Sequence, residues 1–286
     1  MPGRLNEAIN QQLKAAFIER NDVYNRWGNI ISSLLALPNS AGIWPGSSIR
    51  GADGLAGAGN LRSDVGGNHL GDNGTRPQFD YLGLIPIVKY DGSTDYHSIA
   101  DASVNSAFNF VGNESWVPSA NRGLCIGGWF YNDGGLPGGL PRLIGKGTTT
   151  GSLRHYAVYG GSATQVSMSI STTGADFNTP TTYGAGSNDV DFPQDEWSLL
   201  VGRFNSSTSL SIDSWTTSGR NQQIGTTAVP ATIANLSSGF AIAAQADGTR
   251  LVPIWGTMMF AIGQYLPDSF FAALYEQTRI FFPGHI

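Results

Sequence analysis

Hydrophobic positions along the chain follow two different periods, and each period predicts a different structure. Over residues 4–36, apolar side chains recur every three or four positions, which places them on one stripe of an α-helix. Pro38 and Asn39 end this pattern. We therefore expect an amphipathic N-terminal arm, whose apolar stripe consists of Leu5, Ile9, Leu13, Phe17, Tyr24, Trp27, Ile31 and Leu34.

After the arm, short apolar segments alternate with clusters of turn-forming residues, as in a β-rich domain. Residues 41–73 are mostly polar and predict a loop with one short strand near Ile43 and Trp44. Two later segments, QVSMSIS and SLSIDSW, alternate strictly and predict half-buried antiparallel strands. A final short helix, PDSFFAALYEQTRIFF, is expected to be capped by Asp268 or Ser269. The remaining predicted strands lie in LGLIPIVKY, GLCIGGWFY, RLIGKG, RHYAVYG, EWSLLVGRF, GFAIAAQ and PIWGTMMFAIGQY.

The number of strands predicts a sandwich or jelly roll, because roughly nine to thirteen short strands follow one another without helices between them. The arm needs a partner, since a helix of this length is roughly 50 Å long and too apolar to stand alone in water. That partner is either the chain's own β-domain or another subunit or protein. We favour the second and divide the chain into a helical anchoring or oligomerisation arm, residues 1–38, and a β-sandwich, residues 39–286.

Composition supports short strands and excludes some partners. The 286 residues include 38 Gly and 14 Pro, and only 13% are charged, as in turn-rich β-proteins. The net charge is −5 and the 16 Lys and Arg are scattered, so we expect no nucleic-acid partner. No apolar stretch reaches the roughly 20 residues that span a bilayer, and the N-terminus lacks a signal-peptide core, so we expect no membrane partner and no standard secretion. Cys125, in the apolar run LCIGGWF, is expected to be a buried free thiol.

Six motifs in the β-rich part resemble, in the same order, those of laminin-G-like, concanavalin A-like jelly-roll domains of the lectin and glucanase kind. The resemblance covers nearly everything after the arm and implies an all-β concanavalin A-like jelly-roll sandwich. The motifs are GIWP followed by SDVGGNHLGDNG, then IVKYDGSTDYHSIAD, CIGGWFY, LIGKG, WSLLVGRFNSSTSLSIDSW and FAIGQYLPDSFFAALYEQ.

The resemblance also raises the question of a calcium ion. Many members of the family carry an Asp shortly after the Gly of the penultimate motif, where this chain has Met258 and Met259. Asp91 and Asp95 remain as oxygen ligands of the type that calcium prefers. The alternative is a tight turn in which these two carboxylates bind nearby backbone N–H groups. Apart from this calcium ion, we expect no cofactor.

Glycoside hydrolysis is not expected. Enzymes that share this sandwich place two carboxylates about 5 Å apart across a sugar. The chain has no Glu-x-Asp-x-Glu pattern, and nothing local pairs Glu114, Asp133 and Asp213, which are the candidates for a concave face. The aromatic residues offer sugar binding instead, because rings stack on pyranose faces while amides and carboxylates hold hydroxyl groups. The candidate glycan-binding residues are Trp116, Tyr131, Asn132, Asp133, Tyr159 and Trp215, and the alternative for each Trp is a place in the core.

The expected function combines the arm with the sandwich. By analogy of fold, we expect a non-enzymatic bacteriophage virion protein, either a capsid (head) decoration or a fibre-like adhesion subunit. It would be assembled in the host cytoplasm and displayed on the virion surface. The arm would bind other virion proteins or further copies of the chain as a homo-oligomer, and the sandwich would bind a host-surface glycan. The alternatives are a free carbohydrate-binding module and a divergent glycan hydrolase.

Overall fold

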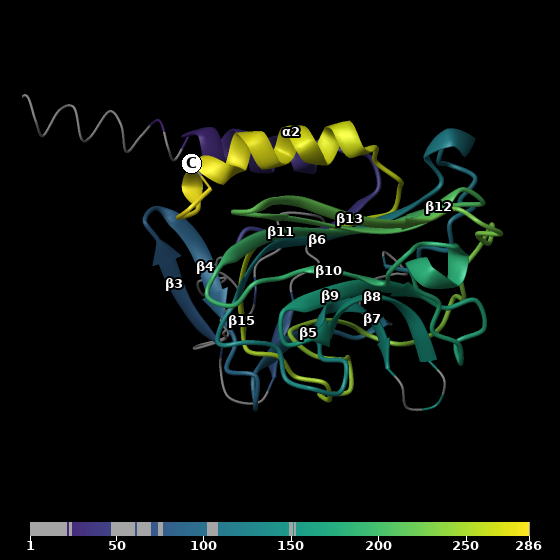
Figure 1. The fold of residues 1–286 in the computed structure, drawn as a ribbon, viewed down its shortest axis with the longest axis horizontal. Coiled ribbons are helices and arrows are strands. Elements are labelled where there is room, and N and C mark those ends of the chain that lie inside the picture. Colours follow the sequence, from purple (N-terminus) through teal and green to yellow (C-terminus); the bar gives the residue numbers. More distant parts are fainter. Residues whose placement is uncertain are drawn as a thin grey trace, which may run out of the picture.

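The computed structural model describes residues 22, 25–46, 61, 70–73, 77–101, 108–148, 151 and 153–285. In this part of the chain, two antiparallel sheets lie face to face, and a pair of helical segments crosses the outer side of one of them (Figure 1). This confirms the predicted all-β sandwich. No helix among the described residues is long and apolar enough to cross a membrane.

The first sheet has eight strands and the second has seven. The first sheet consists, in spatial order, of β13 (Gly219–Gly225), β12 (Ser209–Thr216), β11 (Trp197–Asn205), β6 (Gly123–Asn132), β15 (Ile254–Ile262), β4 (Ile85–Lys89) and β3 (Gln78–Leu82), with β1 (Ser40–Trp44) paired to β15. The second sheet consists of β10 (Asp189–Asp191), β9 (Gln165–Ile170), β8 (Leu153–Ser162), β7 (Arg142–Thr148), β14 (Phe240–Ile242), β5 (Tyr96–Ile99) and β2 (Gly71–Asn73). Each apolar segment that predicted a strand contains one.

The helical elements are short. The α-helix α2 (Asp268–Thr278) runs into the 3-10 turn η5 (Arg279–Phe281), and two further 3-10 turns are η2 (Ser119–Asn121) and η4 (Pro180–Tyr183). The expected side-chain cap of α2 is wrong: Pro267 occupies the cap position, and no side chain makes a capping hydrogen bond to the backbone N–H groups of the first turn. Asp268 instead forms ion pairs with Arg203 and Arg220, two arginines of the first sheet.

The central strands of the first sheet, β12, β11, β6 and β15, are buried on both faces. Leu210 and Ile212 of β12 point into the core between the sheets, whereas Trp215 points outward into a second apolar cluster beneath α2. All eight residues of β12 are consequently buried, so the prediction of a half-buried strand is wrong here. The polar side of β12 tolerates this because Asp213, which is fully buried, pairs with Arg203 at 2.6 Å.

The end of the predicted arm packs on the chain's own sandwich. Residues 25–35 are helical, and Trp27, Ile31 and Leu34 are buried in the cluster on the outer face of the first sheet. The Trp27 ring meets the rings of Phe281 and Phe282 edge-on, with centroids 5.5 and 6.4 Å apart. These three residues therefore pack on the chain's own β-domain, which is the alternative that we did not favour. The other stripe residues, Leu5, Ile9, Leu13, Phe17 and Tyr24, lie outside the described residues.

Candidate functional site

A groove with a volume of about 700 Å³ lies at the end of the sandwich where β6 begins and β15 ends. That volume is within the usual range of small-molecule sites, about 300–1,000 Å³. Four separate chain segments form it, and its lining mixes apolar surface with uncharged polar groups, Glu114 being the one charged residue among those that line it. The lining residues are Asn39, Ser40, Ala41, Asn109, Phe110, Val111, Asn113, Glu114, Ser115, Trp116, Asn235 and Gly263.

Trp116 is the prominent side chain of the groove. Its relative exposure is 71%, and among the described residues no aromatic ring or cation contacts it. A large apolar side chain gains by burial, and an indole N–H also needs a hydrogen-bond acceptor when it is covered. The Trp116 ring is therefore available to stack on a ligand that offers both an apolar face and a hydroxyl group.

The Glu114 side chain stabilises the loop that carries Trp116. This carboxylate is buried and accepts hydrogen bonds from the backbone N–H groups of Val111 and Gly112, at 2.6 and 3.1 Å. Gly112 has a φ of +88°, and a side chain there would collide with Phe204. Glu114 is thus committed to the backbone, and it shapes the groove instead of reacting within it.

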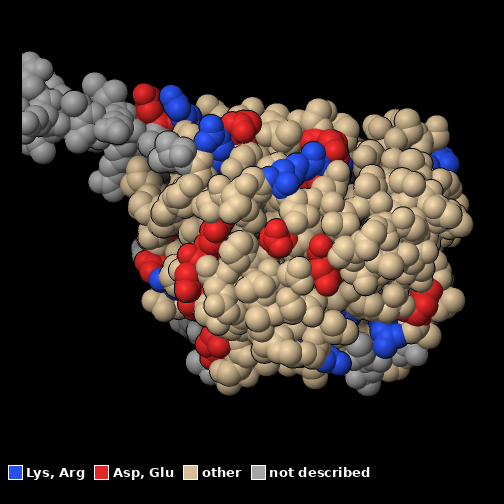
Figure 2. Space-filling model, in the orientation of Figure 1, with Lys and Arg blue, Asp and Glu red and all other residues tan. Residues whose placement is uncertain are grey.

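Four asparagines give the groove its hydrogen-bonding capacity, because each amide presents both donors and acceptors. Two of them are fixed by the fold. The Asn109 carbonyl oxygen accepts a hydrogen bond from the Lys146 ammonium at 2.5 Å, and the Asn39 amide donates to Gln264 at 3.3 Å. Asn113 and Asn235 are exposed at the rim. Figure 2 shows that uncharged residues also dominate one whole face of the molecule, where charged side chains form only small separate groups.

Tyr131 and Asp133 lie at the opposite end of β6, around Trp255. The rings of Tyr131 and Trp255 stack with centroids 4.3 Å apart, and the Trp255 indole N–H donates to the Asp133 carboxylate at 3.1 Å. The Lys89 ammonium lies 4.3 Å from the centre of the Trp255 ring. Tyr131 and Lys89 therefore already contact the Trp255 ring, which leaves less of it free for stacking on a ligand than of the Trp116 ring.

The other three predicted glycan-binding residues are buried. Asn132 has no exposed surface, and its amide donates to the carbonyls of Ala163 and Phe192. Tyr159 and Trp215 are each 4% exposed. As the rings are covered, neither Tyr159 nor Trp215 offers a face to a sugar, and the core alternative holds for Trp215.

The carboxylates considered for catalysis do not converge. Glu114 and Asp133 lie at opposite ends of β6, whose ten residues span roughly 30 Å. Asp213 is buried in its ion pairs with Arg203 and Arg220. This separation is far larger than the 5–10 Å that glycoside hydrolysis requires.

Asp91 and Asp95 form a tight turn. The Asp91 carboxylate accepts hydrogen bonds from the N–H groups of Ser93 and Thr94 at 2.8 and 2.9 Å, and Asp95 accepts one from the Asp91 N–H at 2.7 Å. Burial raises the pKa of Asp95 to about 7, whereas for Asp91 the backbone bonds outweigh burial and lower the pKa. Among the described residues, no three His, Cys, Asp or Glu side chains gather as a metal site. The geometry thus matches the turn alternative.

Met258 and Met259 are both fully buried, because consecutive residues of β15 point to opposite faces and both faces of this strand are covered. Met258 joins the outer cluster and Met259 the core between the sheets. Cys125 is a buried free thiol, as expected, and burial raises its pKa to about 12. Neither the methionines nor the thiol reaches solvent.

No family model matches the sequence, and no curated protein matches it. The structure is similar to the receptor-binding domain of the botulinum neurotoxin C/D mosaic serotype, with a TM-score of 0.53 and 7% identity over 83% of this chain and 51% of that chain. It is also similar to the botulinum neurotoxin serotype D ligand-binding domain solved with N-acetylneuraminic acid, with a TM-score of 0.53 and 9% identity over 86% and 52%. The chain spans about half the length of these proteins, and the likeness shows that they share a β-sandwich fold.

Proposed function

We propose that this protein is a non-catalytic carbohydrate-binding module that holds a neutral glycan in the groove beside Trp116. The observation that carries the proposal is an indole that is 71% exposed at the rim of a groove lined with asparagine amides. Such a groove pairs a stacking surface with neutral donors and acceptors, which suits a ligand that has hydroxyl groups and no charge.

Two further observations support the proposal. The wide separation of Glu114 and Asp133 argues for binding without hydrolysis. One protein of similar fold was solved with N-acetylneuraminic acid. That ligand is an acidic sugar, and this chain spans only about half of that protein, so the likeness supports a carbohydrate ligand in general. The neutral charge of the proposed ligand and the position of the site depend on the groove alone.

The test is binding of the purified chain to an array of neutral oligosaccharides, followed by titration calorimetry with the best ligand. Trp116→Ala should weaken binding by about tenfold or more, because truncation of a central aromatic contact commonly costs over 1–2 kcal/mol. Tyr81→Ala is the matched control, since Tyr81 is 69% exposed on β3 and does not line the groove. If no neutral glycan is retained, or if Trp116→Ala binds as well as the parent, the proposal is wrong.

Display on a phage particle, as a decoration or adhesion subunit, stays a prediction. It depends on whether residues 1–21 attach the sandwich to a larger assembly. Removal of these residues should then release the protein from virions while glycan binding persists. Co-sedimentation of the full and shortened chains with purified particles tests this.

A further inference from the structure

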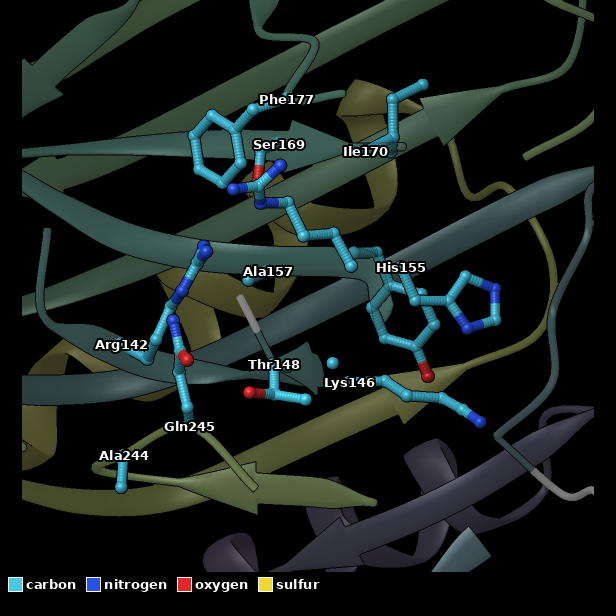
Figure 3. A pocket seen from close by; sticks show the side chains of 14 residues that line it. Arg142, Lys146, Thr148, His155, Ala157, Ser169, Ile170, Phe177, Ala244 and Gln245 are labelled. Atoms are coloured by element: carbon cyan, nitrogen blue, oxygen red, sulfur yellow. The ribbon is translucent and has the colours of Figure 1, made fainter. Parts of the chain in front are cut away.

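A second pocket lies on the second sheet, at the start of β7, and is built around Arg142. This side chain is 7% exposed and lines the pocket together with Phe177 (Figure 3). Its guanidinium carbon lies 4.8 Å from the Phe177 ring centre and 5.4 Å from that of Tyr159. The two rings hold the guanidinium in one place. They cannot neutralise its charge.

Two more arginines surround Arg142 without a counter-ion. Arg154 lines the same pocket, and the Arg142 backbone N–H donates to the Arg250 carbonyl at 2.9 Å. Within the described part of the chain, none of the three takes part in an ion pair, whereas Arg203 and Arg220 of the first sheet are both paired with carboxylates. Burial, and secondarily the charges of Arg250 and Arg154, lower the pKa of Arg142 to about 10, so it is still a cation at pH 7.

The carboxylates beside the pocket are engaged by other groups: Asp247 accepts hydrogen bonds from the Thr148 and Thr249 hydroxyls, and Asp176 accepts them from the backbone N–H groups of Thr172 and Thr173. Residues 149–152, which connect β7 to β8, read Thr-Thr-Gly-Ser and contain no acidic side chain. The Asp189 carboxylate influences Tyr159, yet it forms no ion pair with Arg142 in the part of the structure that is described. A buried, unpaired guanidinium is costly, which makes an external counter-ion favourable.

Donor groups in the pocket wall are also unsatisfied. The Nη1 atom of Arg142 and the Nε atom of Arg154 are buried and have no hydrogen-bond partner. The Nη1 group of Arg154 donates a hydrogen bond to the Ala175 carbonyl, which fixes the side chain beside the pocket. A buried N–H group without an acceptor destabilises the fold, so a ligand oxygen that accepts hydrogen bonds from these two atoms is favoured.

We propose that this pocket binds an oxyanion, a carboxylate or sulfate group of an acidic ligand, between Arg142 and Arg154. The cavity volume is only about 10 Å³, so it admits one oxygen of that group and excludes a sugar ring. The rest of the ligand lies outside the pocket. This site is separate from the Trp116 groove and does not depend on it.

The test is calorimetric titration with sodium glucuronate, glucose and sodium sulfate at constant ionic strength. Glucuronate should bind saturably and glucose should not. Sulfate binding as well would assign the site to oxyanions in general, and binding of glucuronate alone would assign it to carboxylates; both outcomes support the proposal. Arg154→Gln should weaken binding by about tenfold or more, because hydrogen bonds to charged groups contribute about 1.5–3 kcal/mol.

Arg26→Gln is the matched control, since it removes the same charge from an exposed helical position remote from the pocket. Arg142→Gln is a second variant, and a thermal melt shows whether it folds. If Arg142→Gln does not fold, the result with Arg154→Gln alone decides the test. Trp116→Ala should leave oxyanion binding unchanged, which separates this test from that of the groove. The proposal is overturned if neither anion binds, if glucose binds as well as glucuronate, or if Arg154→Gln binds as the parent does.

Discussion

Trp27 decides whether the N-terminal helix is part of the sandwich or a separable arm. Its indole is 6% exposed and contacts Phe281 and Phe282, and Phe282 in turn stacks on Trp129 of the first sheet at 3.9 Å. Truncation of a buried Trp to Ala costs about 3–5 kcal/mol, because it loses apolar burial and leaves a cavity. At roughly 2–4 °C per kcal/mol for a domain of this size, Trp27→Ala should lower Tm by about 6–20 °C.

Trp27→Phe is the control that isolates the ring from its polar atom. The indole Nε1 is buried without a hydrogen-bond partner, so its removal takes away a destabilising group while most of the apolar contact remains. We expect a cost below about 1.5 kcal/mol. Urea denaturation and differential scanning calorimetry of both variants measure the difference. If Trp27→Ala melts cooperatively at the parent's Tm, the helix does not belong to the core, and the separable arm inferred from the sequence is correct.

Three further predictions concern buried charges and metal. Asp213→Asn should lower the free energy of unfolding by up to about 3–5 kcal/mol, because it removes the only fully buried carboxylate that pairs with Arg203 among the described residues and leaves Arg203 with the half-exposed Asp268 alone. Asp80→Asn, in the partly exposed pair with Lys89, should cost under about 1 kcal/mol, and equal effects of the two substitutions in urea denaturation would contradict this prediction. Burial lowers the pKa of His155 to about 3, so only the unfolded chain gains a proton at this residue as pH falls below 6.5. Protonation of the unfolded chain should therefore lower the free energy of unfolding by about 2 kcal/mol between pH 7 and pH 5. His155→Gln should make this free energy less dependent on pH, and an unchanged pH dependence would contradict the prediction. Addition of a chelator should leave Tm unchanged, since backbone N–H groups already occupy the Asp91 carboxylate; a drop of several degrees would restore a calcium site.

The sequence could not predict the groove. Asn39, Asn109, Asn113 and Asn235 come from segments up to about 200 residues apart, and no local pattern links them. The one usable signal was Trp116 beside polar turn residues, which placed it among the candidates. Strand β13 was also missed, because it is a polar edge strand whose sequence, GRNQQIG, lacks the alternation that marks a half-buried face.

Local chemistry determined the elements of this protein. The apolar periods and turn clusters were enough to predict the apolar strands, the final helix and the buried thiol of Cys125, because these depend on neighbours within a few residues. Tertiary structure alone decided which aromatic rings face solvent. Trp215 and Trp116 both stand beside polar turns, yet α2 covers Trp215, and nothing among the described residues covers Trp116. Whether a ring is buried depends on which distant element packs on that face of the sheet, and the alternation of apolar and polar residues within one strand does not identify that element.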